Sequence, residues 1–335
     1  MDQINKKILY IFLHIRKTAG NTLIFHIKNN YRTSQYLFAN GLSLGPDDSF
    51  KEYWRKILSG YTAEEKERLE IIGGHGIYYG IHELFPDKQP YYITVFREPE
   101  QLLLSHYNYL IGHLDSHNER YIKIADLLRI NGKNIPLSEV LASCKYFDDL
   151  LFKSFYDFLF DTRTIEFPDC INGDSDINKL LEKFNGIMAK FHFIGTSSNI
   201  DNDLNYLYGL LNIRKFYRRQ NVSHKYASIE CLNEVERKLL ADRTKLDGKL
   251  HALAVDLPNN IISNAGFLGI SRLSRYRKNI FMLLHPLDYF ATSGISLLYA
   301  ASAEMRKRVM LYGTALDYLK KKLGIGASAK PTAEK

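Results

Sequence analysis

The residues best suited to chemistry lie in one short segment near the amino end, between an apolar run and a helical pattern. The apolar run covers residues 8–15, and it is followed by Lys17, Thr18, Ala19, Gly20, Asn21 and Thr22. A buried parallel strand that leads through small residues into a helix presents backbone N–H groups to an anion. Gly20 permits close approach of the backbone, the threonines offer hydroxyl groups, and Lys17 adds a positive charge. The segment predicts a phosphate-binding loop.

The order of residues in this loop argues against one common kind of phosphate site. In the loop of nucleotide-dependent kinases, the lysine follows two glycines and precedes a hydroxyl residue that binds magnesium. Here Lys17 precedes Gly20, and no second glycine stands before the lysine. An ordinary strand-to-helix turn is the competing interpretation.

The segment resembles the 5′-phosphosulfate loop of sulfotransferases that use 3′-phosphoadenosine 5′-phosphosulfate (PAPS). It reads His-Ile-Arg-Lys-Thr-Ala-Gly-Asn-Thr-Leu from His14 to Leu23, where the family has His-Ile-Pro-Lys-Thr-Ala-Gly-Thr-Thr-Leu. Arg16 replaces a proline that would stiffen the turn, and Asn21 replaces a small hydroxyl residue but can still donate through its amide. The resemblance implies that the 5′ end of PAPS is bound by Arg16, Lys17, Thr18, Ala19, Gly20, Asn21 and Thr22.

A second candidate site follows another predicted strand. Residues 90–96 are rich in β-branched and aromatic side chains, as in buried strands, and Pro99 suits the first turn of a helix. Ser105 lies two turns into that helix, so it can converge with Arg97 on one anion. The core-facing stripe of the helix is expected at Leu103, Tyr107, Leu110 and Leu114. A strand-end ion pair for Arg97 and a solvated Ser105 are the alternatives.

This second pattern resembles the 3′-phosphate motif of the same family, Arg-Asp-Pro-x-x-Arg-Leu-x-Ser-x-Tyr. Glu98 replaces the aspartate and Leu102 replaces the second arginine, so only part of the pattern is present. The resemblance implies that Arg97 and Ser105 hold the 3′-phosphate of PAPS.

A histidine between the two motifs is the candidate general base. Gly73, Gly74 and Gly76 surround His75, and we expect them to place it at the tip of a short strand. Histidine titrates near neutral pH and suits the removal of a hydroxyl proton. Heparan sulfate 2-O-sulfotransferase and its relatives carry their proposed base in a similar His-Gly context. The resemblance therefore assigns this role to His75, with His14 and His82 as weaker candidates.

Two later segments give weaker signals. Residues 191–196 predict a further strand, and Thr196 or Ser197 after it would line the nucleotide pocket or cap the next helix. Residues 215–223 loosely resemble a late Asn-x-Ser segment of the family near the cofactor, although a solvated basic loop explains them equally well.

The elements around these motifs predict an α/β fold. Strands near 8–15, 70–74, 91–96 and 191–195 alternate with helical stretches, which favours a parallel sheet covered on both faces. The resemblance implies a P-loop-like three-layer α/β/α fold. We expect a sulfotransferase domain over 1–270, with a helical insert at 113–190 that could shape the acceptor site. A helical, basic extension would cover 271–335.

Composition and charge add expectations about location. The 335 residues include only three cysteines without metal-type spacing, which fits a reducing cytoplasm. The net charge is +8, and residues 301–335 carry eight basic against three acidic side chains. The apolar stretch 289–303 is shorter than the roughly 20 residues that span a bilayer. With basic clusters on both sides it could lie on an anionic membrane, or it could pack on the domain or a partner subunit.

Together these resemblances imply a PAPS-dependent sulfotransferase that releases adenosine 3′,5′-bisphosphate and needs no metal. His75 would deprotonate a hydroxyl acceptor, a glycan or glycolipid by family likeness, and Lys17 would neutralise the leaving phosphate oxygen. A magnesium-dependent kinase and a catalytically degenerate, membrane-peripheral nucleotide-binding protein are the alternatives. No segment resembles a nucleic-acid module, and a homo-oligomer is compatible with the sequence.

Overall fold

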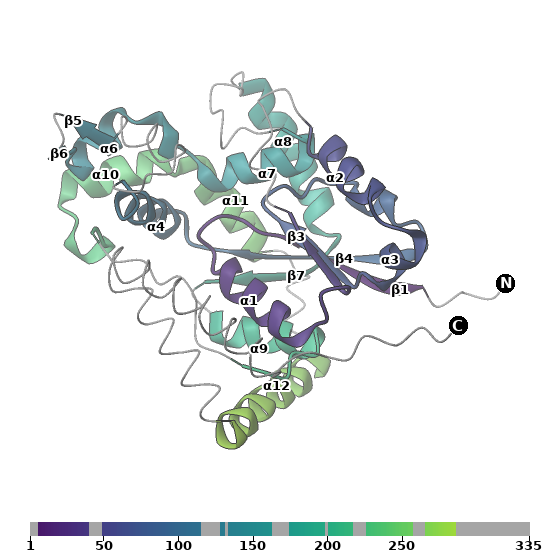
Figure 1. Ribbon diagram of the computed structural model, residues 1–335. Coiled ribbons are helices and arrows are strands. Elements are labelled where there is room, and N and C mark those ends of the chain that lie inside the picture. Colours follow the sequence, from purple (N-terminus) through teal and green to yellow (C-terminus); the bar gives the residue numbers. More distant parts are fainter. Residues whose placement is uncertain are drawn as a thin grey trace, which may run out of the picture.

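The computed structural model describes residues 6–39, 49–114, 128–130, 133–162, 174–197, 200–216, 226–256 and 265–285. A five-stranded parallel sheet forms its centre, with the order β2-β3-β1-β4-β7 (Figure 1). The strands are β1 (Lys7–Leu13), β2 (Tyr36–Phe38), β3 (Ile71–Gly74), β4 (Lys88–Phe96) and β7 (Phe191–Thr196). Helices cover both faces, so the predicted three-layer α/β/α architecture is confirmed.

Continuous apolar runs become the inner strands because both of their faces are buried. In β1, Leu9 and Ile11 enter the core on one face of the sheet, whereas Phe12 enters the core on the other. This arrangement explains why the first predicted strand is apolar throughout rather than alternating. The edge strand β2 has only three half-buried residues, and no sequence pattern predicted it.

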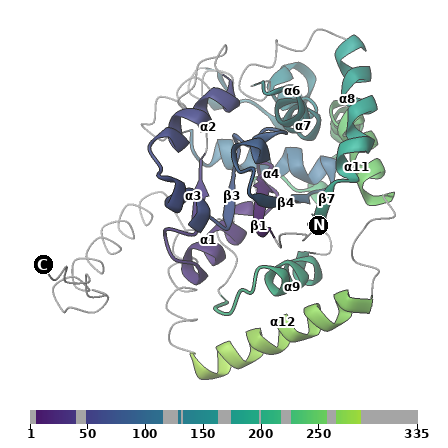
Figure 2. The same ribbon diagram turned by 90° about the vertical axis from the view of Figure 1, so that its right-hand side faces the viewer.

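Two helical layers enclose the sheet (Figures 1 and 2). One face is covered by α2 (Phe50–Ser59), α7 (Leu150–Phe160), α8 (Asp174–Met188) and α11 (Lys245–Asp256). The other face is covered by α1 (Gly20–Asn30), α9 (Ile200–Leu210) and α12 (Ala265–Leu284). A separate apolar cluster joins α4 (Pro99–Ile111), α6 (Leu137–Ser143) and α10 (Glu234–Arg243). The smaller elements are α3 (Ala63–Arg68), the hairpin β5 (Arg129–Ile130) and β6 (Lys133–Asn134), and the 3-10 helices η1 (Ile81–Leu84), η2 (Lys145–Phe147) and η4 (Ile229–Cys231).

The segment predicted as a helical insert contributes directly to the central core. Phe155 of α7 packs edge-on against Phe96 of β4 with ring centroids 5.2 Å apart, and Phe184 of α8 packs against Phe155 at the same distance. These helices therefore form part of a layer of the sandwich. The predicted boundary at residue 270 falls inside α12.

Reciprocal helix caps join α7 to α11. The Asp247 carboxylate of α11 accepts hydrogen bonds from the backbone N–H groups of Leu151 and Phe152, at 3.0 and 2.7 Å. The Asp149 carboxylate in turn accepts from the N–H groups of Leu246 and Asp247. Each aspartate satisfies first-turn donors of the other helix, so the two helices are fixed at their starts.

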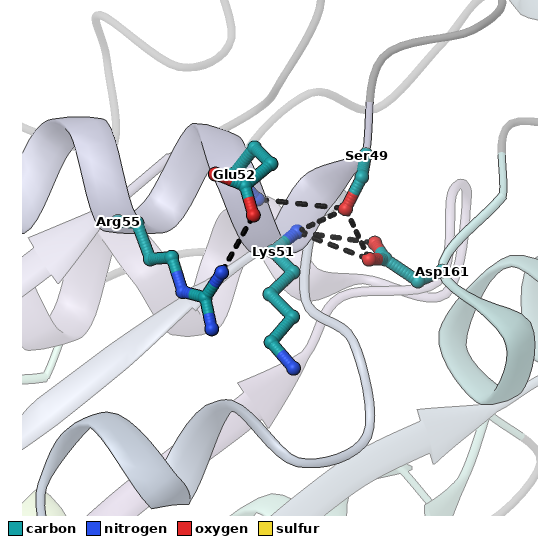
Figure 3. A network of polar contacts seen from close by, with 5 residues as sticks. All are labelled: Ser49, Lys51, Glu52, Arg55 and Asp161. Atoms are coloured by element: carbon teal, nitrogen blue, oxygen red, sulfur yellow. Dashed lines mark hydrogen bonds and ion pairs between the residues drawn. The ribbon is translucent and has the colours of Figure 1, made fainter.

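A second cap links α2 to the end of α7 (Figure 3). The Ser49 hydroxyl accepts from the backbone N–H groups of Lys51 and Glu52, at 3.0 and 3.4 Å. Asp161, which ends α7 in the left-handed conformation (φ 57°), accepts from the Lys51 N–H at 3.1 Å and from the Ser49 hydroxyl. Two helices of the same layer thus share one capping network.

Candidate active site

The loop between β1 and α1 contains two residues in the left-handed conformation and leads into a helix without a side-chain cap. Lys17 and Ala19 both adopt the left-handed conformation, with φ angles of 66° and 67°. Ala19 is the N-cap of α1 and gives the helix no side-chain cap. The amide donors of the first turn, and the positive end of the helix dipole, therefore face the loop without an internal acceptor from a capping side chain.

Gly20 is required for a reason that the sequence did not indicate. A Cβ atom at this position would lie 2.0 Å from Cδ2 of His14, far inside van der Waals contact. The glycine therefore makes room for the buried His14 ring, which packs beneath the start of α1. The space that the missing side chain of Gly20 leaves is therefore filled by the His14 ring.

Three predicted site residues gather at the carboxyl edge of the sheet. His75 follows β3, Lys17 follows β1 and Arg97 follows β4, and these strands are neighbours. Arg97 donates from Nη1 to the Lys17 carbonyl oxygen at 3.1 Å, and His75 Nδ1 lies 2.7 Å from the His14 carbonyl oxygen. The loop after β1 is thus held from both sides.

This edge also contains the switch point of the sheet. After β1 the chain continues to β2 on one side, and after β4 it continues to β7 on the other. The segments that follow β1 and β4 therefore run in opposite directions from the carboxyl ends of the two strands. Ligands of open α/β sheets bind at such points, and Lys17 and Arg97 flank this one.

The two cations lie close together and are half-buried. Burial and the neighbouring charge of Arg97 lower the pKa of Lys17 to about 8. Burial also lowers the pKa of Arg97, which Glu98 opposes. The Arg97 Nε is buried and has no hydrogen-bond partner in the described part of the chain. Like charges in a partly buried site destabilise each other, so an anion bound here would relieve both of them.

His75 lies against a histidine that stays neutral. Burial, with Arg16 and Lys17 nearby, lowers the pKa of His14 to about 3. The two rings stack with centroids 4.1 Å apart. A neutral His75 that donates from Nδ1 to the His14 carbonyl carries its lone pair on Nε2. Gly74 positions this residue with a φ of 136°, and a Cβ there would lie 1.9 Å from the Ala39 carbonyl oxygen.

The other predicted loop residues have different surroundings. The Thr18 hydroxyl is buried and donates to the Ile15 carbonyl at 2.9 Å, so in this conformation it stabilises the loop rather than facing outward. Thr22 is buried in the first turn of α1. Arg16 is half-buried and Asn21 is exposed.

Ser105 is placed by a neighbour that the sequence analysis missed. The Lys17 ammonium lies over the Tyr109 ring, 4.3 Å from its centroid. Tyr109 is one turn after Ser105 on α4, and residues four apart share a helix face. The half-buried Ser105 therefore lies on the side of α4 that faces the loop, although no hydrogen bond joins it to Arg97 among the described residues. The four-residue spacing between Ser105 and Tyr109 was the sequence signal that could have identified Tyr109 as a neighbour of the loop.

The hydroxyls after β7 have protein partners. Thr196 donates from its backbone N–H to the buried Asp203 carboxylate at 2.7 Å, which supports the structural interpretation of this residue. The Ser197 hydroxyl donates to Glu98 at 2.9 Å. Glu98 therefore connects the ends of β4 and β7 and places a carboxylate beside Arg97.

The two weaker candidates differ in position. His14 is buried beneath the loop, where its ring stacks on His75. His82 lies on η1, with Nδ1 2.8 Å from the hydroxyl of Tyr92 in β4. A cavity of about 610 Å³ opens at the amino edge of the sheet, opposite the candidate site. Its Lys88 already donates to the Glu67 and Leu69 carbonyls and its Lys7 pairs with Glu67, so its geometry does not favour it over the carboxyl edge.

Residues 217–225 and 286–335, which include the predicted Asn-x-Ser segment and the basic tail, lie outside the described residues. Within the described part, no group of three or more His, Cys, Asp or Glu side chains is arranged for a metal ion, and no helix combines the length and apolarity needed to cross a membrane. No protein-family model matches the chain, and no curated protein matches it.

Proposed function

We propose that this protein is a P-loop-like sulfotransferase that transfers the sulfuryl group of PAPS to a hydroxyl acceptor. One observation carries the proposal: Lys17 and Arg97, which are far apart in sequence, meet at the ends of adjacent parallel strands, where Arg97 donates to the Lys17 carbonyl oxygen. These are the two positions that the sequence assigned to opposite ends of one nucleotide.

The residues present fit a doubly anionic nucleotide. The buried Arg97 Nε has no acceptor in the described part of the chain, and a phosphate oxygen would supply one in charge-assisted form. The uncapped first turn of α1 would bind the 5′ end through backbone donors. Lys17, with its pKa lowered by burial and Arg97, would regain a full charge beside an anion.

The chemistry follows from these positions. When bound, PAPS supplies the sulfuryl group, whose sulfur forms a bond to the acceptor oxygen as its bond to the bridging phosphate oxygen breaks. His75 would take the acceptor proton on Nε2, with its ring oriented by the His14 carbonyl. Lys17 would neutralise the negative charge that develops on the phosphate oxygen. Positioning and charge stabilisation would supply most of the rate enhancement.

Glu98 favours a second candidate, a nucleotide-binding protein that has lost the chemistry. Its carboxylate is close enough to Arg97 to raise the guanidinium pKa, and it would repel a phosphate at the same place. Its hydrogen bond from Ser197 holds part of that charge away from Arg97.

The sulfotransferase proposal also includes the acceptor and the location. We propose that the acceptor is a glycan or glycolipid and that the protein is cytoplasmic. The free thiols of Cys144 and Cys231 are compatible with a reducing compartment.

Thermal unfolding with three ligand conditions tests the proposal. Adenosine 3′,5′-bisphosphate at about 100 times its dissociation constant should raise the midpoint by roughly 4 °C. ATP with magnesium should do so only for the kinase alternative. A midpoint that rises with ATP and magnesium but not with adenosine 3′,5′-bisphosphate contradicts the proposal.

Turnover of PAPS with a panel of hydroxyl acceptors then separates an enzyme from a binder. His75→Ala should abolish turnover and keep the affinity for the bisphosphate, because this residue contacts the acceptor side. His82→Ala, a histidine with a structural partner, is the matched control and should keep both. Full turnover by His75→Ala would show that another group is the base.

A further inference from the structure

Exposed apolar side chains concentrate on α12, the outermost helix of its layer (Figure 2). In the described part of the chain, eight large apolar side chains are exposed, and five of them belong to this helix: Leu273, Tyr276, Met282, Leu283 and Leu284. Leu283 is 77% exposed and Tyr276 is 63% exposed. A concentration of this kind on one element marks an interaction surface.

Four of these side chains, all except Met282, fall on one stripe along the helix. Ser274 and Phe281, seven residues apart, are buried on the inner side of the helix, where Phe281 packs near Phe216. Tyr276 and Leu283 lie on the opposite side, and Leu273 and Leu284 lie beside them at helical spacing. Arg277 donates to Asn212 at 2.9 Å and fixes the inner side further. The helix therefore has two apolar sides, and the described residues cover only one.

The positive charge of α12 indicates which kind of partner would bind its outer side. The helix sequence contains Arg272, Arg275, Arg277 and Lys278 and no acidic residue. A second copy of this helix would bring four positive charges against four, which disfavours self-association. An anionic lipid surface instead attracts cations near its headgroups while apolar side chains enter the interface. Arg272 and Arg275 border the apolar stripe by helical periodicity, as such a helix requires.

The sequence beyond α12 again contains an apolar stretch next to basic residues. Residues 289–303 are apolar and are followed by Arg306, Lys307 and Arg308. We propose that the outer side of α12 docks on the surface of an anionic bilayer, with its apolar stripe in the interface and its cations at the headgroups. This proposal is independent of the chemistry at the carboxyl edge of the sheet.

Vesicle co-sedimentation of the full chain tests the surface. Wild type should bind vesicles made of equal parts phosphatidylcholine and phosphatidylglycerol, release them at high salt, and bind pure phosphatidylcholine poorly. Arg272→Gln with Arg275→Gln should weaken binding by about 25-fold, at about fivefold for each cation. Leu283→Ser with Leu284→Ser should weaken it at least roughly tenfold.

A matched control distinguishes vesicle binding through this surface from non-specific binding by any exposed apolar side chain. Val235 on α10 is 66% exposed, the same fraction as Leu284, and Val235→Ser should bind like wild type. All variants should keep the wild-type unfolding midpoint, because the changed side chains are exposed. Failure of wild type to bind anionic vesicles, or wild-type binding by both α12 variants, overturns the proposal. So does a concentration-dependent dimer without lipid that Leu283→Ser with Leu284→Ser abolishes, because the stripe would then serve a second copy.

Discussion

Substituting Gly20 by alanine should destabilise the protein through one side chain, the ring of His14. The new Cβ would lie 2.0 Å from Cδ2 and 2.2 Å from Nε2 of His14, whereas ordinary contact begins at 3.4 Å. The ring would have to move by more than 1 Å. It cannot move easily, because it stacks on Phe12 at 5.4 Å and on His75 at 4.1 Å. Overpacking of this kind costs about 1–3 kcal/mol.

Removing the His14 ring should reverse the sign of the stability change that Gly20→Ala causes. In a His14→Ala background the alanine at position 20 meets no ring, and Gly-to-Ala in a helix then stabilises by roughly 0.5–1 kcal/mol. The coupling energy of the double-mutant cycle should therefore reach about 2 kcal/mol. Gly186→Ala on α8, where a Cβ would meet nothing within 4 Å, is the control and should stabilise.

Urea unfolding of the four proteins in the cycle, followed by circular dichroism, measures these differences as shifts in the midpoint. A destabilisation by Gly20→Ala that persists undiminished in the His14→Ala background would refute the reasoning. It would mean that the glycine is needed for backbone freedom or for a ligand rather than for the packed ring.

Three further predictions concern charge and capping. Since burial and Arg97 lower the pKa of Lys17 to about 8, about half of this amine is neutral at pH 8, and binding of adenosine 3′,5′-bisphosphate should take up about half a proton; calorimetry in two buffers of different ionisation enthalpy measures the uptake, which should shrink as pH falls to about 7 and be absent in Lys17→Ala. Burial raises the pKa of Asp247 from 3.8 to about 8, so the folded state binds more protons than the unfolded state between these values, and the free energy of unfolding should fall as pH rises through this range; denaturant titrations should show a shallower fall for Asp247→Asn, and an equal slope would contradict the assignment. Ser49→Ala should cost about 1 kcal/mol through loss of its cap, whereas Ser59→Ala, whose exposed hydroxyl only bonds the Lys56 carbonyl, should cost little in the same titration.

Much of the layout was readable from local patterns. Runs of apolar, β-branched and aromatic residues are typical of buried strands, and the runs near 8, 71, 91 and 191 form β1, β3, β4 and β7. Pro99 starts α4 as expected, and the predicted stripe from Leu103 to Leu114 is buried. These features depend on periods of two and 3.6 residues, which the sequence displays directly.

What escaped prediction depends on pairs of residues far apart in the chain. No periodicity relates Asp149 to Asp247, yet each caps the helix that carries the other. The Lys17–Tyr109 contact likewise requires α4 to lie across the loop. The loop signal was found from residue types alone, but the contact between Gly20 and His14 depends on how the ring is packed.

The central claim is that Lys17 and Arg97 bind opposite ends of one nucleotide, and a comparison of two ligands tests it most directly. Dissociation constants of adenosine 3′,5′-bisphosphate and adenosine 5′-monophosphate should be measured by calorimetry for wild type, Lys17→Ala and Arg97→Gln. We expect Lys17→Ala to weaken both ligands at least roughly tenfold. We expect Arg97→Gln to weaken the bisphosphate at least roughly tenfold more than the monophosphate, which loses only the support that Arg97 gives the loop. Equal losses for the two ligands in Arg97→Gln, or unchanged affinities in both variants, would contradict the claim.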